Sequence, residues 1–427
     1  MTARSLLLLI AVAFALLTPL PAAQAQQSAR LLEQSAQVDF PASVTFRVRA
    51  QSPTAITRAE VRFATDHQTC ARAETSAFAD LDPSTSVDAQ WTWDLRQGGV
   101  LPPGAAIRYH WLLYDQNGIA LDTPWETVRA QDAAYQWQHV GRGNLDLYWY
   151  KGDAAFAGAL LDSGEQAIAR VRELFQREIQ GPISVYIYAS GEDLLNSLVF
   201  PDPWTGGQAL SDYNTVVIGI APESLGWGVR AIAHELTHVA IGQAVFNCSS
   251  GLPTWLNEGL ATYNEDATGE PSSGYAEPLK QGIREDRLLS VPGLSEGFPA
   301  DSEGALLAYG ESNSLASYLL KSYGDAKMRQ LLETFRQGVD ADAALLSVYG
   351  FDQAGLDALW RAGIGAKARK AGQTIVQPLP TPIFPALEPY GAGLSPSATA
   401  TPTGVAVVAT PTPTFAPAAA KGGGCNR

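Results

Sequence analysis

The chain has 427 residues, 46% of them hydrophobic, and a formal net charge of −14. This acidic balance argues against a nucleic-acid-binding protein, because phosphate binding needs clustered Lys and Arg. The three cysteines, Cys70, Cys248 and Cys425, do not have the number or spacing of a disulfide scaffold or a thiolate metal site. They are compatible with one bridge, whose pairing stays open.

The first residues have the composition of a secretory signal. Residues 1–4 form a short basic segment, and residues 6–17 form an unbroken apolar run. Residues 23–25 have the small residues of a cleavage site. This order predicts a signal peptide over residues 1–25. The run is shorter than the roughly 20 apolar residues that span a bilayer, and an uncleaved anchor is the alternative. No later stretch resembles a membrane helix, so we expect a protein that is secreted or held at the cell surface, outside the cytoplasm.

Residues 36–132 are predicted to form an all-β domain. Apolar and polar residues alternate with the period of half-buried strands at 44–49, 61–63, 91–93 and 107–113. Short strands of this kind, separated by Pro/Gly turns, are typical of an immunoglobulin-like or fibronectin-like sandwich. Such a domain usually presents or spaces another part of the protein.

Residues 140–365 are predicted to be mixed α/β and then largely helical. Asp153 can cap a long helix whose apolar stripe runs from Ile168 to Ile179 at spacings of three and four. Strands are predicted at 145–150, 183–187 and 215–220. The fold class is thus a β sandwich followed by an α+β domain with a helical C-terminal part.

Residues 229–241 are predicted to form a helix that is apolar on nearly all sides. Such a helix lies in a core, where His234, Glu235 and His238 would be costly unless paired or bound to a metal. The two histidines are four residues apart, so their imidazoles share one helical face and can bind one zinc ion. Glu235 lies one step round the helix, where it can take a proton from zinc-bound water as the general base.

A catalytic zinc also needs a third protein ligand and an open position. Twenty residues after the second histidine, the segment 253–263 is predicted to be a helix with Thr254 as its N-cap. Glu258 is the predicted ligand, since an acid among apolar neighbours is costly without a positive partner. A surface glutamate on an amphipathic helix is the alternative. Glu265 and Asp266 are alternative ligands that the pattern places in solvent at the helix end.

His-Glu-Leu-Thr-His followed by Trp-Leu-Asn-Glu-Gly-Leu-Ala resembles the gluzincin metallopeptidases, in particular the peptidase-MA-like, thermolysin-related branch. The resemblance covers residues 140–365. It implies that His234, His238 and Glu258 are the ligands of one zinc ion per chain, with water completing the shell. It also implies that Glu235 is the catalytic base.

The same resemblance implies two further features of the cleft. Strand 215–220 would be the edge of the active-site sheet, against which an extended substrate could pair. The segment that begins at Tyr309 resembles the helix on the far side of such clefts, so Tyr309 would stabilise the oxyanion of the tetrahedral intermediate. A tyrosine that lies in the core at the start of a helix is the alternative.

The chain departs from the family pattern in three respects. Thermolysin-like enzymes carry a catalytic histidine far downstream, whereas this chain has none after His238. They also place an acid one helical turn beyond the glutamate ligand, and here that position is Thr262, so the support of the zinc histidines is weaker or built differently. The substrate-amine motif of gluzincin aminopeptidases is absent as well, which leaves exopeptidase action unsupported.

Residues 377–427 are rich in Pro, Thr, Ala and Gly and contain repeated Thr-Pro steps. This composition cannot bury enough apolar surface to offset the entropy of ordering, which predicts a disordered tail. Cell-surface association through this tail is one alternative to free secretion. Cys425 is either an attachment point or an end without a role.

The predicted function is that of a secreted zinc peptidase acting on peptide or protein substrates. One alternative is a catalytically inactive, zinc-containing surface-binding protein, and another is an adhesion protein led by the β domain. A serine or cysteine hydrolase is poorly supported, because residues 140–365 contain no histidine besides the two of the motif, and His139 just precedes them.

Overall fold

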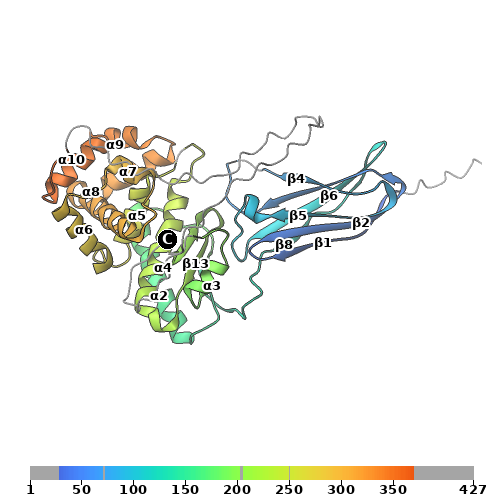
Figure 1. The fold of residues 1–427 in the computed structure, drawn as a ribbon, viewed down its shortest axis with the longest axis horizontal. Helices are drawn as coiled ribbons and strands as arrows, with labels where there is room; N and C mark the ends of the chain where they lie inside the picture. Colours follow the sequence, from blue (N-terminus) through green and yellow to red (C-terminus); the bar gives the residue numbers. More distant parts are fainter. Residues whose placement is uncertain (1–27, 71–72, 202–204, 250, 370–427) are drawn as a thin grey trace, which may run out of the picture.

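The computed structural model describes residues 28–70, 73–201, 205–249 and 251–369. A β-rich part lies at one end of the molecule and a group of helices at the other, with a mixed sheet between them (Figure 1). The predicted signal peptide and Pro/Thr-rich tail lie outside the described residues. Within the described ranges, no helix is long and apolar enough to cross a membrane.

The N-terminal part consists of two antiparallel sheets around one core. The first sheet has the order β1 (Arg30–Asp39), β2 (Ser43–Ile56), β5 (Ser84–Asp94). The second has the order β4 (Thr75–Ala79), β3 (Arg58–Thr65), β6 (Ala106–Asp115), β7 (Gly118–Asp122), with β8 (Glu126–Arg129) also paired to β6. Buried Phe46 of β2 and Phe63 of β3 stack with ring centroids 5.2 Å apart, which joins the two sheets. The immunoglobulin-like or fibronectin-like identity remains a prediction.

The middle of the molecule is a five-stranded mixed sheet. Its order is β12 (Gly207–Leu210), β13 (Thr215–Gly219), β11 (Ile183–Tyr188), β10 (Leu145–Trp149), β9 (Gln138–Arg142). β10, β11 and β13 are parallel, and the two outer strands are antiparallel to their neighbours. The prediction that 215–220 forms the edge is wrong, because β12 pairs outside β13. A four-residue strand is too short to show a periodic pattern.

Two long helices, α2 (Ala154–Phe175) and α4 (Leu225–Val245), pack on one face of this sheet (Figure 1). The Asp153 carboxylate accepts the Phe156 N–H, as expected of the predicted cap. The helix ends four residues earlier than the predicted stripe, at Phe175, because Gln176 adopts a left-handed conformation with φ 53°. Ile179 nevertheless packs against the core. The short α3 (Gly191–Asn196) lies on the other face, against an aromatic cluster.

The C-terminal part is helical, as predicted. Its helices are α5 (Thr254–Tyr263), α6 (Ser273–Glu285), α7 (Val291–Glu296), α8 (Ser302–Arg336), α9 (Ala341–Tyr349) and α10 (Gln353–Gly363). The prediction of Thr254 as an N-cap is wrong, because α5 begins at this residue and Pro253 occupies the cap position. The Thr254 hydroxyl instead donates to the Ser295 carbonyl, which ties α5 to α7.

The β-rich part is fastened to the mixed sheet near its edge. A disulfide joins Cys70, just after β3, to Cys248, just after α4, and this resolves the pairing that the sequence left open. The Gln68 N–H also donates to the carbonyl of Asp212, 2.7 Å away and two residues beyond β12. The β-rich part is therefore held beside the segment that carries the edge strand.

Candidate metal centre

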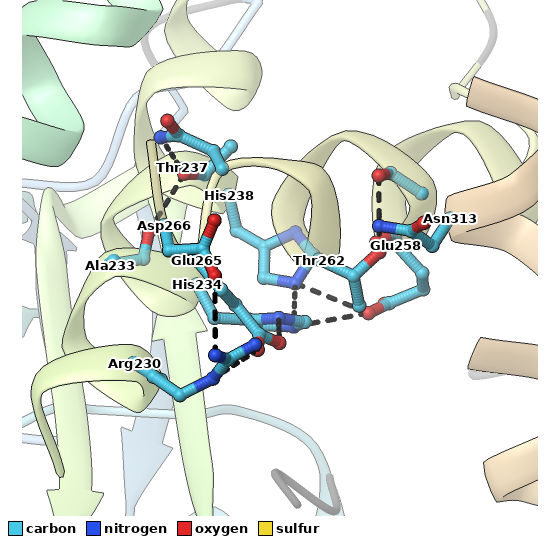
Figure 2. Close-up of polar contacts among 12 residues, drawn as sticks. Arg230, Ala233, His234, Thr237, His238, Glu258, Thr262, Glu265, Asp266 and Asn313 are labelled. Carbon is cyan, nitrogen blue, oxygen red and sulfur yellow. Dashed lines mark hydrogen bonds and ion pairs between the residues drawn. The ribbon is translucent and has the colours of Figure 1, made fainter. Parts of the chain in front are cut away.

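Two helices bring the three predicted ligands together. His234 and His238 point from one face of α4, and Glu258 points toward them from α5 (Figure 2). The two histidine Nε2 atoms lie 3.1 Å apart, and Glu258 Oε2 lies 3.3 Å from that of His234 and 3.4 Å from that of His238. All three side chains are buried, with exposures of 2%, 9% and 0%. The contact between α4 and α5 thus builds a compact, buried cluster of ligand atoms.

The spacing of these atoms fits a tetrahedral zinc shell. Zinc bonds of about 2.0–2.1 Å in a tetrahedron separate neighbouring ligand atoms by roughly 3.3 Å. The observed separations of 3.1, 3.3 and 3.4 Å agree with that value. Two imidazoles and one carboxylate, with the fourth position left to water, are also a donor set of catalytic zinc sites.

The second ring nitrogen of each histidine has an acceptor of its own. His234 Nδ1 lies 3.2 Å from Glu265 Oε1, and His238 Nδ1 lies 3.1 Å from Asn257 Oδ1. These contacts assign the ring protons to Nδ1 and leave both Nε2 lone pairs directed at the cluster. Two lone pairs and a carboxylate oxygen at such separations repel one another, and a cation between them removes the repulsion. The cluster therefore has the chemistry of a metal site.

Glu265 corrects one prediction from the sequence. It was expected in solvent, but it is buried, with 6% exposure, and Arg230 donates to its Oε2 from Nε and Nη2 (Figure 2). Asp266 is partly exposed and contacts the same Arg230. Neither acid belongs to the ligand cluster. Because α5 ends at Tyr263, no helical spacing links Glu265 to Glu258, and the sequence gives no signal that Glu265 turns back toward His234.

Thr262 takes no part in supporting the histidines. Its hydroxyl donates to the Glu258 carbonyl, within its own helix (Figure 2). The zinc histidines are thus supported differently from the family pattern, which was one of the two outcomes that the sequence left open. Glu265, three residues after Thr262, contacts His234 instead.

Glu235 lies beside the cluster rather than within it. Its buried side chain lines a cavity of about 470 Å³ together with His238 and Asn257. The cavity also reaches Gly207 of β12, where a Cβ atom would lie only 2.8 Å from Glu235 Oε1. The carboxylate therefore faces the edge strand, and any side chain at Gly207 would displace it.

Tyr309 lies next to the cluster on α8. Its buried ring is centred 6.1 Å from the ring of His234 and stacks on Tyr275 at 5.2 Å. Because α8 begins at Ser302, Tyr309 lies two turns inside the helix rather than at its start. The structure thus places it beside the ligands, and its role at the oxyanion remains a prediction.

The model of the Peptidase MA superfamily matches residues 163–366. No curated protein sequence matches the chain. Among solved structures, an M1 zinc metallopeptidase from Deinococcus radiodurans is 16% identical over 81% of this chain and 96% of its own, with a TM-score of 0.35. Aminopeptidase A of Legionella pneumophila, in complex with aspartic acid, is 10% identical over 77% of this chain and 50% of its own, with a TM-score of 0.37.

A third solved structure, OgpA from Akkermansia muciniphila, is 10% identical over 25% of this chain and 29% of its own, with a TM-score of 0.19. Because these TM-scores are low, the three likenesses carry no argument about function. The superfamily match is different, because it spans the whole ligand cluster and agrees with its geometry. Residues 163–366, which contain His234, His238 and Glu258, match the Peptidase MA superfamily, and this match supports a gluzincin-like metallopeptidase family for this part of the chain.

Proposed function

We propose that this protein is an exported zinc peptidase that hydrolyses peptide bonds in peptide or protein substrates. The observation that carries the proposal is the buried cluster of His234, His238 and Glu258, whose atoms have the separations of a tetrahedral shell. One zinc ion per chain is expected there. Bound zinc supplies a water of pKa about 7 and polarises the substrate carbonyl.

Glu235 is the proposed general base. From its place beside His238 in the cavity, its carboxylate accepts a proton from the attacking water as the water oxygen bonds to the peptide carbonyl carbon. It then donates this proton to the leaving amine as the C–N bond breaks, which restores the carboxylate. A positioned base of this kind contributes typically ~10²–10⁴-fold to the rate.

Tyr309 is the proposed donor to the oxyanion. The position of its ring beside His234 supports this role, and the chain has no histidine after His238 to take it. Tyr309→Phe should keep the stacking on Tyr275 and the bound zinc, yet lower turnover by about 10²-fold. Unchanged turnover in this variant would assign the oxyanion to another group.

An extended substrate is proposed to pair with β12. Among the described strands, β12 pairs with β13 alone, and Gly207, Gln208 and Ala209 line the cavity that holds Glu235. Main-chain pairing along a sheet edge would lay the scissile bond beside the base and the ligand cluster.

Export is proposed from residues 1–25, which have the composition of a signal peptide. The disulfide between Cys70 and Cys248 supports this assignment, because such bridges persist in oxidising compartments outside the cytoplasm. Association with the cell surface through residues 377–427 is a further proposal, based on composition alone.

The test combines metal content with turnover. Purified protein should contain one zinc ion per chain by elemental analysis, and His238→Ala should lose it. Glu235→Gln should keep the zinc while peptide hydrolysis falls by ~10²–10⁴-fold. Folded wild-type protein without zinc would refute the metal site. Zinc without any hydrolysis would instead favour the inactive surface-binding protein.

A further inference from the structure

We infer that the cavity beside the metal cluster selects an apolar side chain of the substrate, and that the bond cleaved lies inside a peptide rather than at its amino terminus. This inference rests on the proposed peptidase function and names its substrate class. It is drawn from the chemistry of the walls of the 470 Å³ cavity, a volume within the usual range for binding pockets.

One wall of the cavity is apolar. It is formed by Val199, Phe200, Ile241, Val245 and Leu252. Ile241 and Val245 lie on α4, three and seven residues after His238, and therefore on the same side of the helix as this ligand. The apolar wall therefore begins directly beside the metal cluster and is close enough to contact residues flanking the scissile bond.

Phe200 differs from the other residues of this wall in its exposure and its backbone conformation. Its side chain is 78% exposed, the largest value among the exposed large apolar residues in the described part of the chain. Its backbone has φ 55°, in the left-handed region that residues other than glycine rarely adopt. Strained conformations of this kind gather at binding and catalytic sites, and an exposed aromatic ring at a cavity wall offers apolar contact to a ligand.

The described residues that line the cavity offer few charged groups to a substrate. Among the described residues that line it, the ionisable side chains are Glu235 and His238, the proposed base and a proposed zinc ligand. Against these described residues, a charged substrate side chain would lose its hydration and find no partner besides the base and the zinc ligand, whereas an apolar one gains from burial. The cavity therefore favours Val, Leu, Ile, Met or Phe at the substrate position that it receives.

The same distribution of charge argues against binding of a free amino terminus. An α-ammonium group held near the scissile bond needs a carboxylate partner. Among the described lining residues, Glu235 carries the carboxylate. If this carboxylate paired with the α-ammonium group, it could no longer accept the proton of the attacking water. A substrate whose chain continues along β12 avoids this conflict, because its peptide groups pair with the strand and alternate side chains face the wall.

The experiment uses the zinc-loaded full chain and a peptide library in two forms, one with acetylated and one with free amino termini, with cleavage positions mapped by mass spectrometry. Binding of the same peptides to Glu235→Gln protein is measured by fluorescence anisotropy. Leu252→Arg places a cation in the wall, and the matched control Leu346→Arg changes an exposed residue of α9 outside the cavity. Zinc content and circular dichroism verify that each variant is folded.

The expected result is cleavage of acetylated peptides at internal bonds, with apolar residues beside the bond preferred roughly tenfold or more over charged ones. Leu252→Arg should shift this preference toward Asp and Glu, and Leu346→Arg should leave it unchanged. Cleavage restricted to peptides with free amino termini, or cleavage without an apolar preference, would overturn the inference while the peptidase function stands. Binding that prefers apolar peptides, without any cleavage, would support the apolar selectivity of the cavity and refute the peptidase function. If peptides are neither bound nor cleaved, both the inference and the peptidase function are refuted.

Discussion

Glu265 accepts a hydrogen bond from Nδ1 of His234, although the two residues lie 31 positions apart. The other oxygen of this carboxylate accepts from Arg230, one turn before His234 on α4. Arg230 therefore holds the acid that orients the histidine. A histidine with its Nδ1 proton engaged in this way presents Nε2 to a metal in one tautomer and one orientation.

Removal of this carboxylate should weaken zinc binding. In Glu265→Ala the ring of His234 loses its acceptor, and zinc affinity is expected to fall about 10–100-fold. A competition titration with a chromophoric chelator measures the change. Asp266→Ala is the matched control, because Asp266 contacts Arg230 but not His234. Equal losses in both variants would show that the charge around Arg230, rather than the bond to the histidine, supports the metal.

A methyl group at Gly207 should disturb the base and spare the metal. The added Cβ would lie 2.8 Å from Oε1 and 3.1 Å from Cδ of Glu235, so the carboxylate must move. We expect Gly207→Ala to lower peptide hydrolysis by roughly 10–100-fold, since small misplacements of a catalytic group are costly. Zinc content should stay the same. Gly226→Ala, at a helical position with no neighbouring atom within 4 Å of the new methyl, should keep full activity.

Loss of the disulfide should destabilise the protein without dismantling the metal cluster. The bridge between Cys70 and Cys248 closes a sequence separation of 178 residues. The double variant Cys70→Ser/Cys248→Ser is expected to lose about 2–4 kcal/mol of unfolding free energy. Denaturant titration of oxidised protein measures this loss, with Cys425→Ser as the control that leaves the bridge intact. Zinc should still bind to the folded double variant, because its ligands come from α4 and α5.

Glu311 should make stability depend on pH. Burial raises the pKa of this carboxyl on α8 from 4.5 to about 8. The hydrogen bond that it accepts from the Leu289 N–H lowers the pKa, but by less. Below pH 4.5 the folded and unfolded states are both protonated at this site, and the contribution to stability is complete. Between pH 4.5 and 8 the unfolded chain releases the proton and the folded chain keeps it, so stability falls as pH rises.

Urea unfolding of wild type and Glu311→Gln at several values between pH 5 and 8 tests this dependence. The neutral glutamine keeps an acceptor for the Leu289 N–H, so the variant should fold and should show a flatter dependence on pH. The same slope in both proteins would mean that Glu311 does not titrate in this range.

Local patterns in the sequence predicted much of the fold and the three residues of the buried cluster. The spacing of four residues placed His234 and His238 on one helical face, and the cost of burying an acid identified Glu258 as their partner. Alternating residues likewise marked the longer strands, such as the one that contains Phe46. These inferences succeeded because each depends on the geometry of a single helix or strand.

The tertiary structure alone decided the features that depend on contact between distant segments. It placed Glu265 against His234, Cys70 against Cys248, and Gly207 at the sheet edge beside Glu235. The sequence shows which residues share a face of an element, because backbone geometry repeats with a fixed period. Which faces then meet depends on packing and on the course of the loops, and neither has such a period.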